Sequence, residues 1–420
     1  MSPKPFVDQA IIIAAGESSR FWPLNHYHKS QIRILGHSLT YWTIKSLAEQ
    51  GIKNIVVVVR PPFFRQEELK KDVEKLGINF SFAIQDQPLG TGNAIWRAKD
   101  LLKKEPFFVF WPYKVQAGEI AKKILEKYQT TDCQAVLVGG KVATPGDYGF
   151  IKYEGDCVTA ICEKPKPGEE PSDIRVMGCY FFEPDFFEYY EKVKGTRPED
   201  FVDALSLYCQ HKKMRFIVWD EFAPRLKYPW EVLDFLKLML NPEKFKPYIA
   251  ASAKIGQSVK ITGPVYIGEQ TIIGDYSVIE GPCYLGHNCR LGIHNVLRGP
   301  VDLEDEVVTG AFMELKNCLI QRGTHFHSGY LGDSVVGENC RFGAGFISAN
   351  RRFDRQPIKT IVKGKEVNTN LTSLGAIIGN QVSFGIHSGT MPGVLIGSNC
   401  LIHPDTMVFK NLPDNTIWSG

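Results

Sequence analysis

The stretch IGQSVKITGPVYIGEQTIIGDYSVIEGPCYLG, residues 255–286, has a period of six residues. An aliphatic side chain returns at every sixth position, often followed by Gly. The series runs on beyond this stretch, and ten of its eleven members are Ile or Leu: Ile255, Ile261, Ile267, Ile273, Ile279, Leu285, Leu291, Leu297, Leu303, Thr309 and Leu315. A six-residue repeat of this kind is typical of a parallel β-helix, in which each coil stacks its apolar side chain on the coil before it.

The repeat slips in phase and is then interrupted by a charged segment. It resumes at Val336 and Phe342, stops over residues 348–373, and returns from Ile378 to Ile402. Insertions that project from a regular solenoid usually carry contacts rather than core. We therefore expect the segment 348–373 to contribute to a binding site.

The first half of the chain has a different pattern. Short β-rich runs such as AIIIAAG and NIVVVV alternate with amphipathic stretches such as SLTYWTIKSLAEQG. This alternation predicts βαβ units and a Rossmann-like, mainly parallel sheet with helices on both faces, whose ligands bind beyond the carboxyl ends of the strands. A Pro-containing break follows it, so we predict an α/β domain over residues 1–240, a linker over 241–253 and a β-helix over 254–420.

Composition narrows the classes of function. The 420 residues are 44% hydrophobic and 23% charged, and the net charge is only +3, which gives no bulk electrostatic reason to expect nucleic acid or an acidic membrane as a partner. Ten cysteines without CxxC spacing indicate reduced thiols rather than disulfides or a zinc site. No apolar run approaches the roughly 20 residues of a membrane span, so we expect a cytoplasmic protein.

A phosphate-binding loop follows the first β-rich run. The segment AAGESSRFWPLNHYHKS, residues 14–30, resembles the signature loop of sugar-1-phosphate nucleotidylyltransferases. A Gly-rich turn after a strand lets backbone N–H groups approach phosphate oxygens, and basic side chains neutralise the charge of a triphosphate. The resemblance implies that Gly16, Arg20 and Lys29 bind the nucleotide.

Two more segments extend this resemblance over most of the first half. QDQPLGTG, residues 85–92, is similar to the base-reading segment of the uridylyltransferase branch, which implies UTP, dTTP or a UDP-sugar as ligand. YGFIKYEGDCVTAICEKP, residues 148–165, resembles the strand on the sugar side of the site. The resemblance implies base contacts from Gln85, Gly90 and Thr91, and sugar contacts from Gly149, Glu163 and Lys164.

The acids that should hold Mg²⁺ are missing. In the family, the strand matching FFVFWPYK, residues 107–114, ends in Gly-Asp, whereas this chain has Pro112 and Tyr113, and the second metal ligand falls on Lys227. Nucleotidyl transfer depends on a metal that offsets phosphoryl charge, and Mg²⁺ prefers carboxylate oxygens. We expect little or no nucleotidyl transfer and no Mg²⁺ at these positions, with a fixed charge from Lys227 in the metal's place as the alternative.

The β-helix carries a second set of matching residues. The segment from Met313 to Asp354 resembles the acetyltransferase domain of the bifunctional N-acetylglucosamine-1-phosphate uridylyltransferase / glucosamine-1-phosphate acetyltransferase family, which has a left-handed β-helix. Acetyl transfer from a thioester to an amine needs a base for the ammonium proton and a donor for the developing oxyanion. The resemblance implies acetyl-CoA as donor, an amino-sugar phosphate as acceptor, and a homotrimer.

The residues of this second site follow from the same resemblance. His327 takes the position of the catalytic base, and two positions depart from the family, with Arg341 in place of an Asn and Gln356 in place of a Lys. The sugar phosphate is expected to contact Arg298, Lys316, Tyr330, Asn350 and, as a candidate third phosphate anchor, Arg341.

Three functions remain open at this point. The leading hypothesis is an amino-sugar-1-phosphate acetyltransferase fused to a nucleotidylyltransferase-like half without its Mg²⁺ site. The second is a working nucleotidylyltransferase whose metal is held by other acids, such as Asp86, Asp220 or Glu221. The third is a sensor or scaffold that binds sugar nucleotides without turnover.

Overall fold

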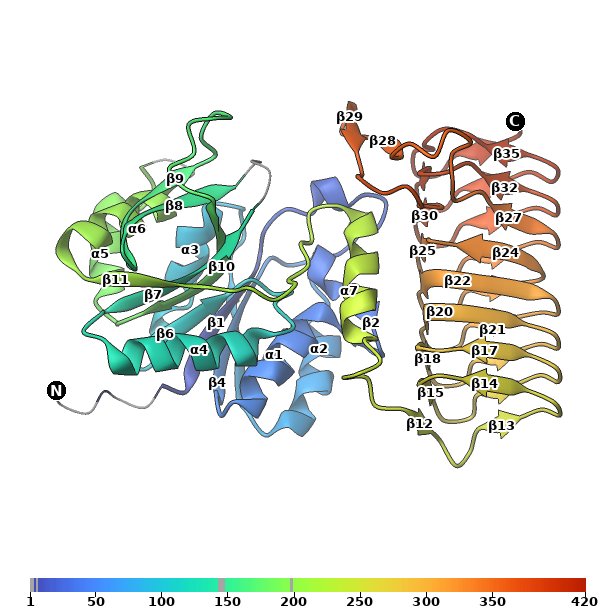
Figure 1. Cartoon of the computed structure of the whole chain (residues 1–420), viewed down its shortest axis with the longest axis horizontal. Coiled ribbons are helices and arrows are strands. Elements are labelled where there is room, and N and C mark those ends of the chain that lie inside the picture. Colours follow the sequence, from blue (N-terminus) through green and yellow to red (C-terminus); the bar gives the residue numbers. More distant parts are fainter. Residues whose placement is uncertain (1–3, 5–6, 143–147, 197–198) are drawn as a thin grey trace. The chain divides into compact units, whose positions relative to one another are not determined.

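The chain divides into two compact units. A computed structural model describes residues 4, 7–142, 148–196 and 199–420. Met1–Glu17 and Ser38–Ala223 form one unit, named here the α/β unit, and Ser18–His37 and Pro224–Gly420 form the other, named the solenoid unit. Figure 1 shows the mixed sheet with its helices and the stacked coils.

The α/β unit is built on a nine-stranded sheet with the order β5-β4-β1-β6-β10-β7-β11-β9-β8. The strands β1, β4, β5 and β6 are parallel, and β10 runs antiparallel to its neighbours β6 and β7. The strand bounds are β1 Gln9–Ala14, β4 Asn54–Val59, β5 Asn79–Ile84, β6 Phe107–Phe110, β7 Ala135–Lys141, β8 Gly149–Glu154, β9 Cys157–Glu163, β10 Ile174–Phe182 and β11 Met214–Val218.

Helices cover both faces of this sheet. One core joins the sheet to α1, α2 and α4, and the other joins it to α3, α5 and α6. Ile12 of β1 packs in the first core and Ile11 in the second, which explains why this parallel strand, buried on both faces, is apolar from Ala10 to Ala14. The helix bounds are α1 Leu39–Glu49, α2 Gln66–Val73, α3 Gly90–Arg97, α4 Ala117–Thr130, α5 Phe186–Val193 and α6 Asp200–His211.

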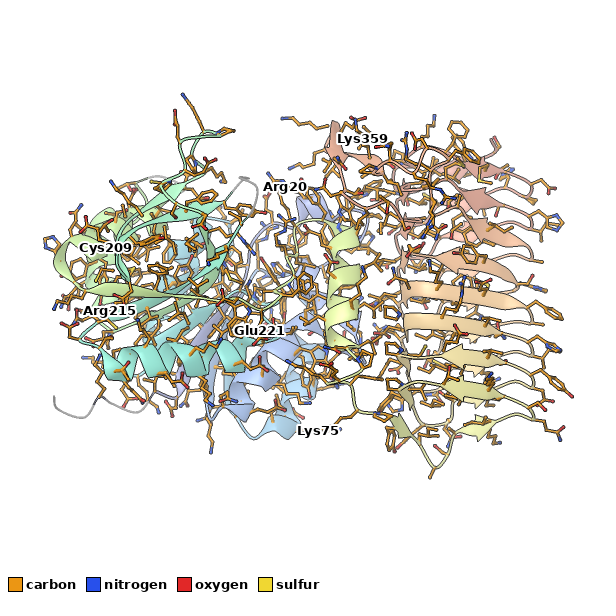
Figure 2. All side chains as sticks on the ribbon, in the orientation of Figure 1. Arg20, Lys75, Cys209, Arg215, Glu221 and Lys359 are labelled. Atoms are coloured by element: carbon orange, nitrogen blue, oxygen red, sulfur yellow. The ribbon has the colours of Figure 1, made fainter. Side chains whose placement is uncertain are left out.

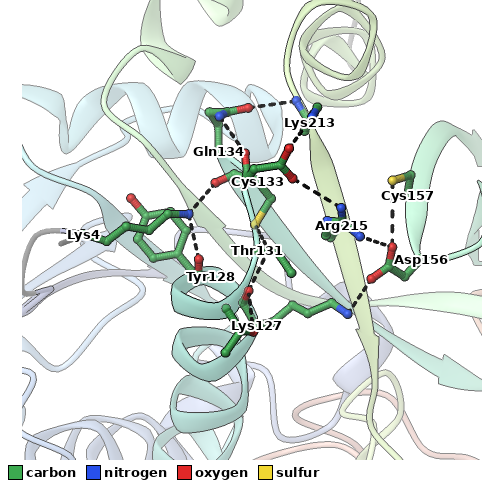
Figure 3. Close-up of polar contacts among 12 residues, drawn as sticks. Lys4, Lys127, Tyr128, Thr131, Cys133, Gln134, Asp156, Cys157, Lys213 and Arg215 are labelled. Atoms are coloured by element: carbon green, nitrogen blue, oxygen red, sulfur yellow. Dashed lines mark hydrogen bonds and ion pairs between the residues drawn. The ribbon is translucent and has the colours of Figure 1, made fainter. Parts of the chain in front are cut away.

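A network of ion pairs joins residues near the start of strands β7 and β11 (Figure 3). Asp132 pairs with Lys213 and with Arg215, the latter at 3.3 Å, and Asp156 pairs with Arg215 and with Lys127 of α4. Hydrogen bonding to Lys213 lowers the pKa of Asp132. Because β7 is parallel to β1, this network lies at the edge of the sheet opposite the loop after β1, and we interpret it as structural.

The solenoid unit is a parallel β-helix, as the six-residue period predicts, and the family resemblance implies its left-handed sense. Three hexads make one coil, so equivalent residues are 18 apart: Ile273 pairs with Leu291, and Ile279 with Leu297. The phase slip has a simple cause, since the next coils are shorter and Leu315 pairs with Leu331, only 16 residues on. The stacked aliphatic side chains form one continuous core.

The strands of the coils fall into two sheets. The larger contains β12 Tyr248–Ile249, β14 Lys260–Thr262, β15 Val265–Ile267, β17 Val278–Glu280, β18 Cys283–Leu285, β20 Val296–Leu303, β22 Met313–Ile320, β24 Gly329–Gly332, β25 Val335–Val336, β27 Phe346–Ser348, β30 Ile377–Ile378, β32 Gly389–Thr390, β33 Leu395–Ile396 and β35 Met407–Val408. The smaller contains β13 Lys254–Ile255, β16 Ile272–Ile273, β19 Arg290–Leu291, β21 Val308–Thr309, β23 His325–Phe326, β26 Arg341–Phe342, β31 Ser383–Phe384, β34 Leu401–Ile402 and β36 Ile417–Trp418.

Three further elements complete the solenoid unit. The insertion forms an antiparallel hairpin of β28 Lys359–Val362 and β29 Lys365–Asn368. Helix α7, Val232–Met239, contacts β20 and β22 (Figure 1). The segment Ser18–His37, named here the arm, begins with two 3-10 helices, η1 Ser19–Phe21 and η2 Lys29–Gln31, and contains β2, Arg33–Ile34, which pairs with β3, His37–Ser38.

Two buried carboxylates anchor the arm to the coils. Arg33 Nε lies 3.4 Å from Glu304 Oε2, and the backbone N–H of Gly36 donates to the same side chain at 2.9 Å. The N–H of Leu35 donates to Asp302 at 2.7 Å. These long-range bonds join the arm to the solenoid unit, whereas the domain ranges divided at 240 and 254 stay a prediction.

Candidate functional site

A buried carboxylate organises the predicted acetyl-transfer site. Asp333, only 4% exposed, accepts hydrogen bonds from Asn317 Nδ2 at 2.6 Å and from Asn350 Nδ2 at 2.5 Å. Lys316 Nζ lies 3.7 Å from the same carboxylate. Asn350 Nδ2 also donates to the hydroxyl of Tyr330 at 3.2 Å. Three predicted residues, Lys316, Tyr330 and Asn350, are thus brought together around one charge.

The coil register stacks the two predicted phosphate anchors. Arg298 of β20 pairs directly with Lys316 of β22, one strand spacing of about 4.8 Å away. Like charges that face each other across strands destabilise a sheet. Here Glu314, two residues before Lys316 on the same face, accepts a hydrogen bond from Arg298, while Asp333 offsets Lys316. Both cations therefore remain on one ladder, partly exposed.

The predicted general base, His327, lies close in sequence to the strands of this ladder. His327 is exposed and follows β23, three residues before Tyr330. Between them, Gly329 has a φ of +134°, and a Cβ there would lie 1.9 Å from the Phe346 carbonyl oxygen. Only Gly therefore permits this path from His327 to Tyr330. Burial, followed by the charge of Asp333, raises the pKa of Tyr330, so this residue keeps its hydroxyl proton at neutral pH.

The two departures from the family pattern lie elsewhere in the solenoid unit. Arg341 is on β26 in the smaller sheet, and its guanidinium donates to the carbonyls of Gly323 at 2.7 Å and Cys340 at 3.0 Å. The structure thus places Arg341 outside the cluster around Asp333. Lys359, near Gln356, pairs with Glu366 across the hairpin at 2.8 Å.

The predicted base-reading residues line one cavity of the α/β unit. Gln85 at the end of β5 donates to the Gly90 carbonyl and to Asn93 Oδ1, both at 3.0 Å, which fixes the first turn of α3. The cavity has a volume of about 440 Å³, within the range of small-molecule sites. Its lining residues are Ile13, Gly16, Glu17, Gln85, Pro88, Gly90 and Thr91.

Two of the three predicted sugar-side residues, Glu163 and Lys164, line another cavity of the same unit. Glu163 at the end of β9 pairs in register with Gly149, where a Cβ would lie 2.7 Å from Glu163 Oε2, and Lys164 Nζ lies 3.4 Å from Glu163 Oε1. The cavity measures about 470 Å³ and is polar, with acids from Asp203 of α6 and from Glu199, which precedes that helix. It is lined by Ile161, Glu163, Lys164, Glu199, Val202, Asp203 and Ser206.

Arg20 and Lys29, the two cationic residues predicted in the nucleotide loop, belong to the solenoid unit. The N–H of Lys29 donates to Ser18 Oγ at 2.9 Å. Burial lowers the pKa of Lys29 to about 8, the charge of Glu231 opposes this, and the charges of Arg20 and Lys227 lower the pKa further. The charges of Arg20 and Lys227 therefore each disfavour a proton on Lys29.

The expected metal-ligand positions do not suit Mg²⁺. The Trp111 ring lies against Gly178, where a Cβ would be 2.1 Å from the indole, and Tyr113 packs beside Trp111 with ring centroids 5.9 Å apart. Next to them Lys114 is buried, and burial lowers its pKa. Lys227 offers an ammonium group, which cannot ligate a metal while protonated. Mg²⁺ prefers carboxylate and phosphate oxygens, so these residues do not fit it.

The three acids considered as alternative metal ligands are exposed. Asp86 follows β5, and Asp220 and Glu221 follow β11, with Glu221 accepting a hydrogen bond from Gln116 at 3.3 Å. Figure 2 labels Glu221. Among the residues that the structure describes, no group of three His, Cys, Asp or Glu side chains is placed to hold a metal ion. Across the same described ranges, no helix is both long enough and apolar enough to cross a membrane.

The fold and these residues define a nucleotidyltransferase-type α/β unit joined to a β-helix, and comparison with known proteins agrees. The Nucleotidyl transferase family matches residues 9–223. The bifunctional sugar-1-phosphate nucleotidylyltransferase/acetyltransferase of Sulfurisphaera tokodaii is 32% identical over 96% of this chain and 98% of its own length. The bifunctional protein GlmU is 35% identical in Methanococcus maripaludis strain C7 and 34% identical in Methanocaldococcus jannaschii, in each case over 97% of this chain and 96% of the relative.

The chain therefore belongs to the family of bifunctional sugar-1-phosphate nucleotidylyltransferase/acetyltransferases. The predicted resemblance and fold class are confirmed. Reasoning from sequence missed the carboxylates Asp333, Glu314 and Glu231, which hold the predicted cations. One signal was available for Asp333, since it follows Tyr330 by three residues within the matched segment. In the structure its φ is +50°, a conformation that Asp tolerates better than most residues.

Proposed function

We propose that this chain transfers an acetyl group from acetyl-CoA to the amino group of an amino-sugar-1-phosphate. The observation that carries this proposal is the cluster of Lys316, Tyr330 and Asn350 around buried Asp333, in which Tyr330 follows His327 by three residues in the chain. It offers a cation for phosphate and neutral hydrogen-bonding groups for hydroxyls, which is what a sugar phosphate requires.

The chemistry assigned to the chain is a proton transfer beside an acyl transfer. The His327 imidazole accepts a proton from the ammonium group of the sugar, which frees the nitrogen lone pair. The nitrogen attacks the thioester carbonyl carbon, so that a C–N bond forms and the C–S bond breaks. The nitrogen loses its second proton as the amide forms, and this proton converts the departing coenzyme A thiolate to the thiol, while the proton held by His327 passes to solvent. Arg298 and Lys316 bind the phosphate, and Tyr330 with Asn350 orients the sugar ring.

The same proposal assigns no Mg²⁺-dependent nucleotidyl transfer to the α/β unit. Tyr113 and Lys227 stand where metal-binding acids are expected, and neither supplies the anionic oxygen that Mg²⁺ prefers. Cavities lined by Gln85 and by Glu163 support binding of a nucleotide or a sugar without turnover. A homotrimer is also part of this proposal, and sedimentation of the full chain tests it.

The test measures thiol release from acetyl-CoA with glucosamine-1-phosphate and with galactosamine-1-phosphate. Removing a general base lowers rates by about 10²–10⁴-fold, so His327→Ala should lose turnover by that factor. His403→Ala, at another exposed histidine of the coils, is the matched control and should remain active. Equal activity of both variants, or no thiol release by the native chain with either sugar, contradicts the proposal.

A parallel assay separates the nucleotidyl alternative. The native chain is incubated with UTP or dTTP, Mg²⁺ and a sugar-1-phosphate, and release of pyrophosphate is followed. No release is expected. Mg²⁺-dependent release would favour a relocated metal site at Asp86, Asp220 or Glu221, and variants at those three positions would locate it.

A further inference from the structure

Three aromatic side chains are stacked at one corner of the solenoid unit, and they are named here the aromatic stack. Tyr276, His294 and Phe312 lie on successive coils. The ring centroids of Tyr276 and His294 are 5.2 Å apart with 12° between the ring planes, and those of His294 and Phe312 are 5.2 Å apart with 3° between the planes. All three side chains are exposed, Tyr276 to 53% and Phe312 to 66%.

The backbone at this corner suits other types of residue better. Tyr276, His294 and Phe312 have φ values of +60°, +56° and +58°. In this left-handed region a bulky side chain is an outlier, whereas Asn is tolerated, and the same solenoid places Asn288 and Asn339 in this conformation. Exposed rings gain little from burial, so the stability of the fold does not explain them. Residues held in such conformations are concentrated at binding sites.

The aromatic stack ends at Phe312 because the next corner is shorter. Strands β21 and β23 pair in register, as do β22 and β24. Three residues connect β21 to β22, with Phe312 as the last, whereas only two residues, His327 and Ser328, connect β23 to β24. The upper corner therefore has no equivalent of Phe312. Among the described residues, His294 makes the one ring contact of Phe312, so the opposite face of this ring is open to a ligand.

The proposed phosphate anchors lie on the same coils as the aromatic stack. Arg298 follows His294 by four residues, and Lys316 follows Phe312 by four residues. Four extended residues span about 13 Å, so the cations and the rings form two parallel rows across neighbouring coils. The Arg298 and Lys316 side chains remain 43% and 30% exposed. His327 lies on the next coil, which contains β24 (Figure 1).

We propose that the amino-sugar acceptor carries a nucleoside diphosphate, whose base stacks on the open face of Phe312. A nucleobase has a planar face that aromatic side chains bind by stacking. Two phosphoryl groups match Arg298 and Lys316, two cations on adjacent coils, better than the one phosphate of a sugar-1-phosphate does. The amino sugar then reaches Tyr330 and His327 on the next coil. This inference rests on the proposed function and specifies its acceptor as a nucleotide-linked amino sugar.

Thiol release from acetyl-CoA by the full chain, with UDP-glucosamine and with glucosamine-1-phosphate as acceptors, tests the inference. Stacking of one base corresponds to about tenfold or more in binding, so kcat/KM should be higher for UDP-glucosamine by that factor. Phe312→Asn removes the ring and suits the left-handed backbone, so the two acceptors should then react with equal kcat/KM. Tyr276→Asn makes the same kind of change at the far end of the aromatic stack, and it should alter the ratio of the two values by less than about twofold.

Several results would overturn the inference. Equal kcat/KM for the two acceptors in the native chain is one, and equal changes of the ratio in Phe312→Asn and Tyr276→Asn are another. A Phe312→Asn variant that changes only the KM for acetyl-CoA is a third, because the ring would then bind the adenine of coenzyme A. Circular dichroism and the melting temperature check that both variants fold.

The same assay separates this inference from the proposed function. Thiol release with glucosamine-1-phosphate alone would reject the nucleotide-linked acceptor and leave the proposed acetyl transfer standing. Thiol release with UDP-glucosamine that is lost in Phe312→Asn supports both. No thiol release with either acceptor would contradict the proposed function itself, and this inference with it.

Discussion

Replacing Asp333 by Asn tests whether one buried carboxylate holds the acetyl-transfer site together. Asn has the same shape and keeps one acceptor oxygen, which can still accept from Asn317. Its NH₂ group then faces Asn350 Nδ2, where the native carboxylate accepts at 2.5 Å, so that two donors meet. The ammonium of Lys316, 3.7 Å away in the native protein, also loses its counter-charge.

The magnitude follows from the burial of the group. One hydrogen bond to a charged acceptor contributes about 1.5–3 kcal/mol, and the half-buried Lys316 adds less than about 1 kcal/mol because solvent screens it. The expected loss is about 2–3 kcal/mol. In a unit of this size, 1 kcal/mol changes the melting temperature by about 2–4 °C, which gives a decrease of about 4–12 °C.

Scanning calorimetry of the full chain measures this change, and Glu314→Gln is the matched control. Glu314 and Arg298 are 38% and 43% exposed, so their ion pair should contribute under about 1 kcal/mol. We expect a small shift for Glu314→Gln and a large one for Asp333→Asn, together with roughly tenfold lower kcat/KM for the sugar phosphate in the latter. Equal shifts in the two variants would refute the reasoning.

Two other outcomes are expected. Burial raises the pKa of Glu304 to about 7 and also raises the pKa of neighbouring Asp302. The folded state therefore retains a proton on Glu304 that the unfolded chain releases above the ordinary glutamate pKa of 4.5, and this stabilisation is lost as pH rises through 7. Asp302→Asn should accordingly raise the melting temperature at pH 8 more than at pH 5. Gly329→Ala should abolish most thiol release, since its Cβ would collide with the Phe346 carbonyl, whereas unchanged activity would show that the path to the histidine tolerates a shift.

Reasoning from sequence located those residues of the candidate sites whose position follows from the order of strands and loops along the chain. Gly16, Gln85, Gly90 and Thr91 line one cavity because parallel strands bring the residues that follow their carboxyl ends to one edge of a sheet. The cluster of Lys316 with Tyr330 and Asn350 could not be placed in this way. This cluster depends on the shortening of the coils from 18 to 16 residues, because the length of a coil decides which side chains stack on one another.

The sequence by itself determined the two architectures, because a six-residue aliphatic period and a βαβ alternation each record which side chains a regular backbone buries. Only the tertiary structure decided the partners of the charged groups. Arg33 meets Glu304 across 271 positions of sequence, and Ser19 meets Lys363 across 344. Such pairs leave no periodic pattern, since a charge finds its partner through the packing of distant coils. The tertiary structure therefore decided that the arm, a phosphate-loop sequence, belongs with the solenoid.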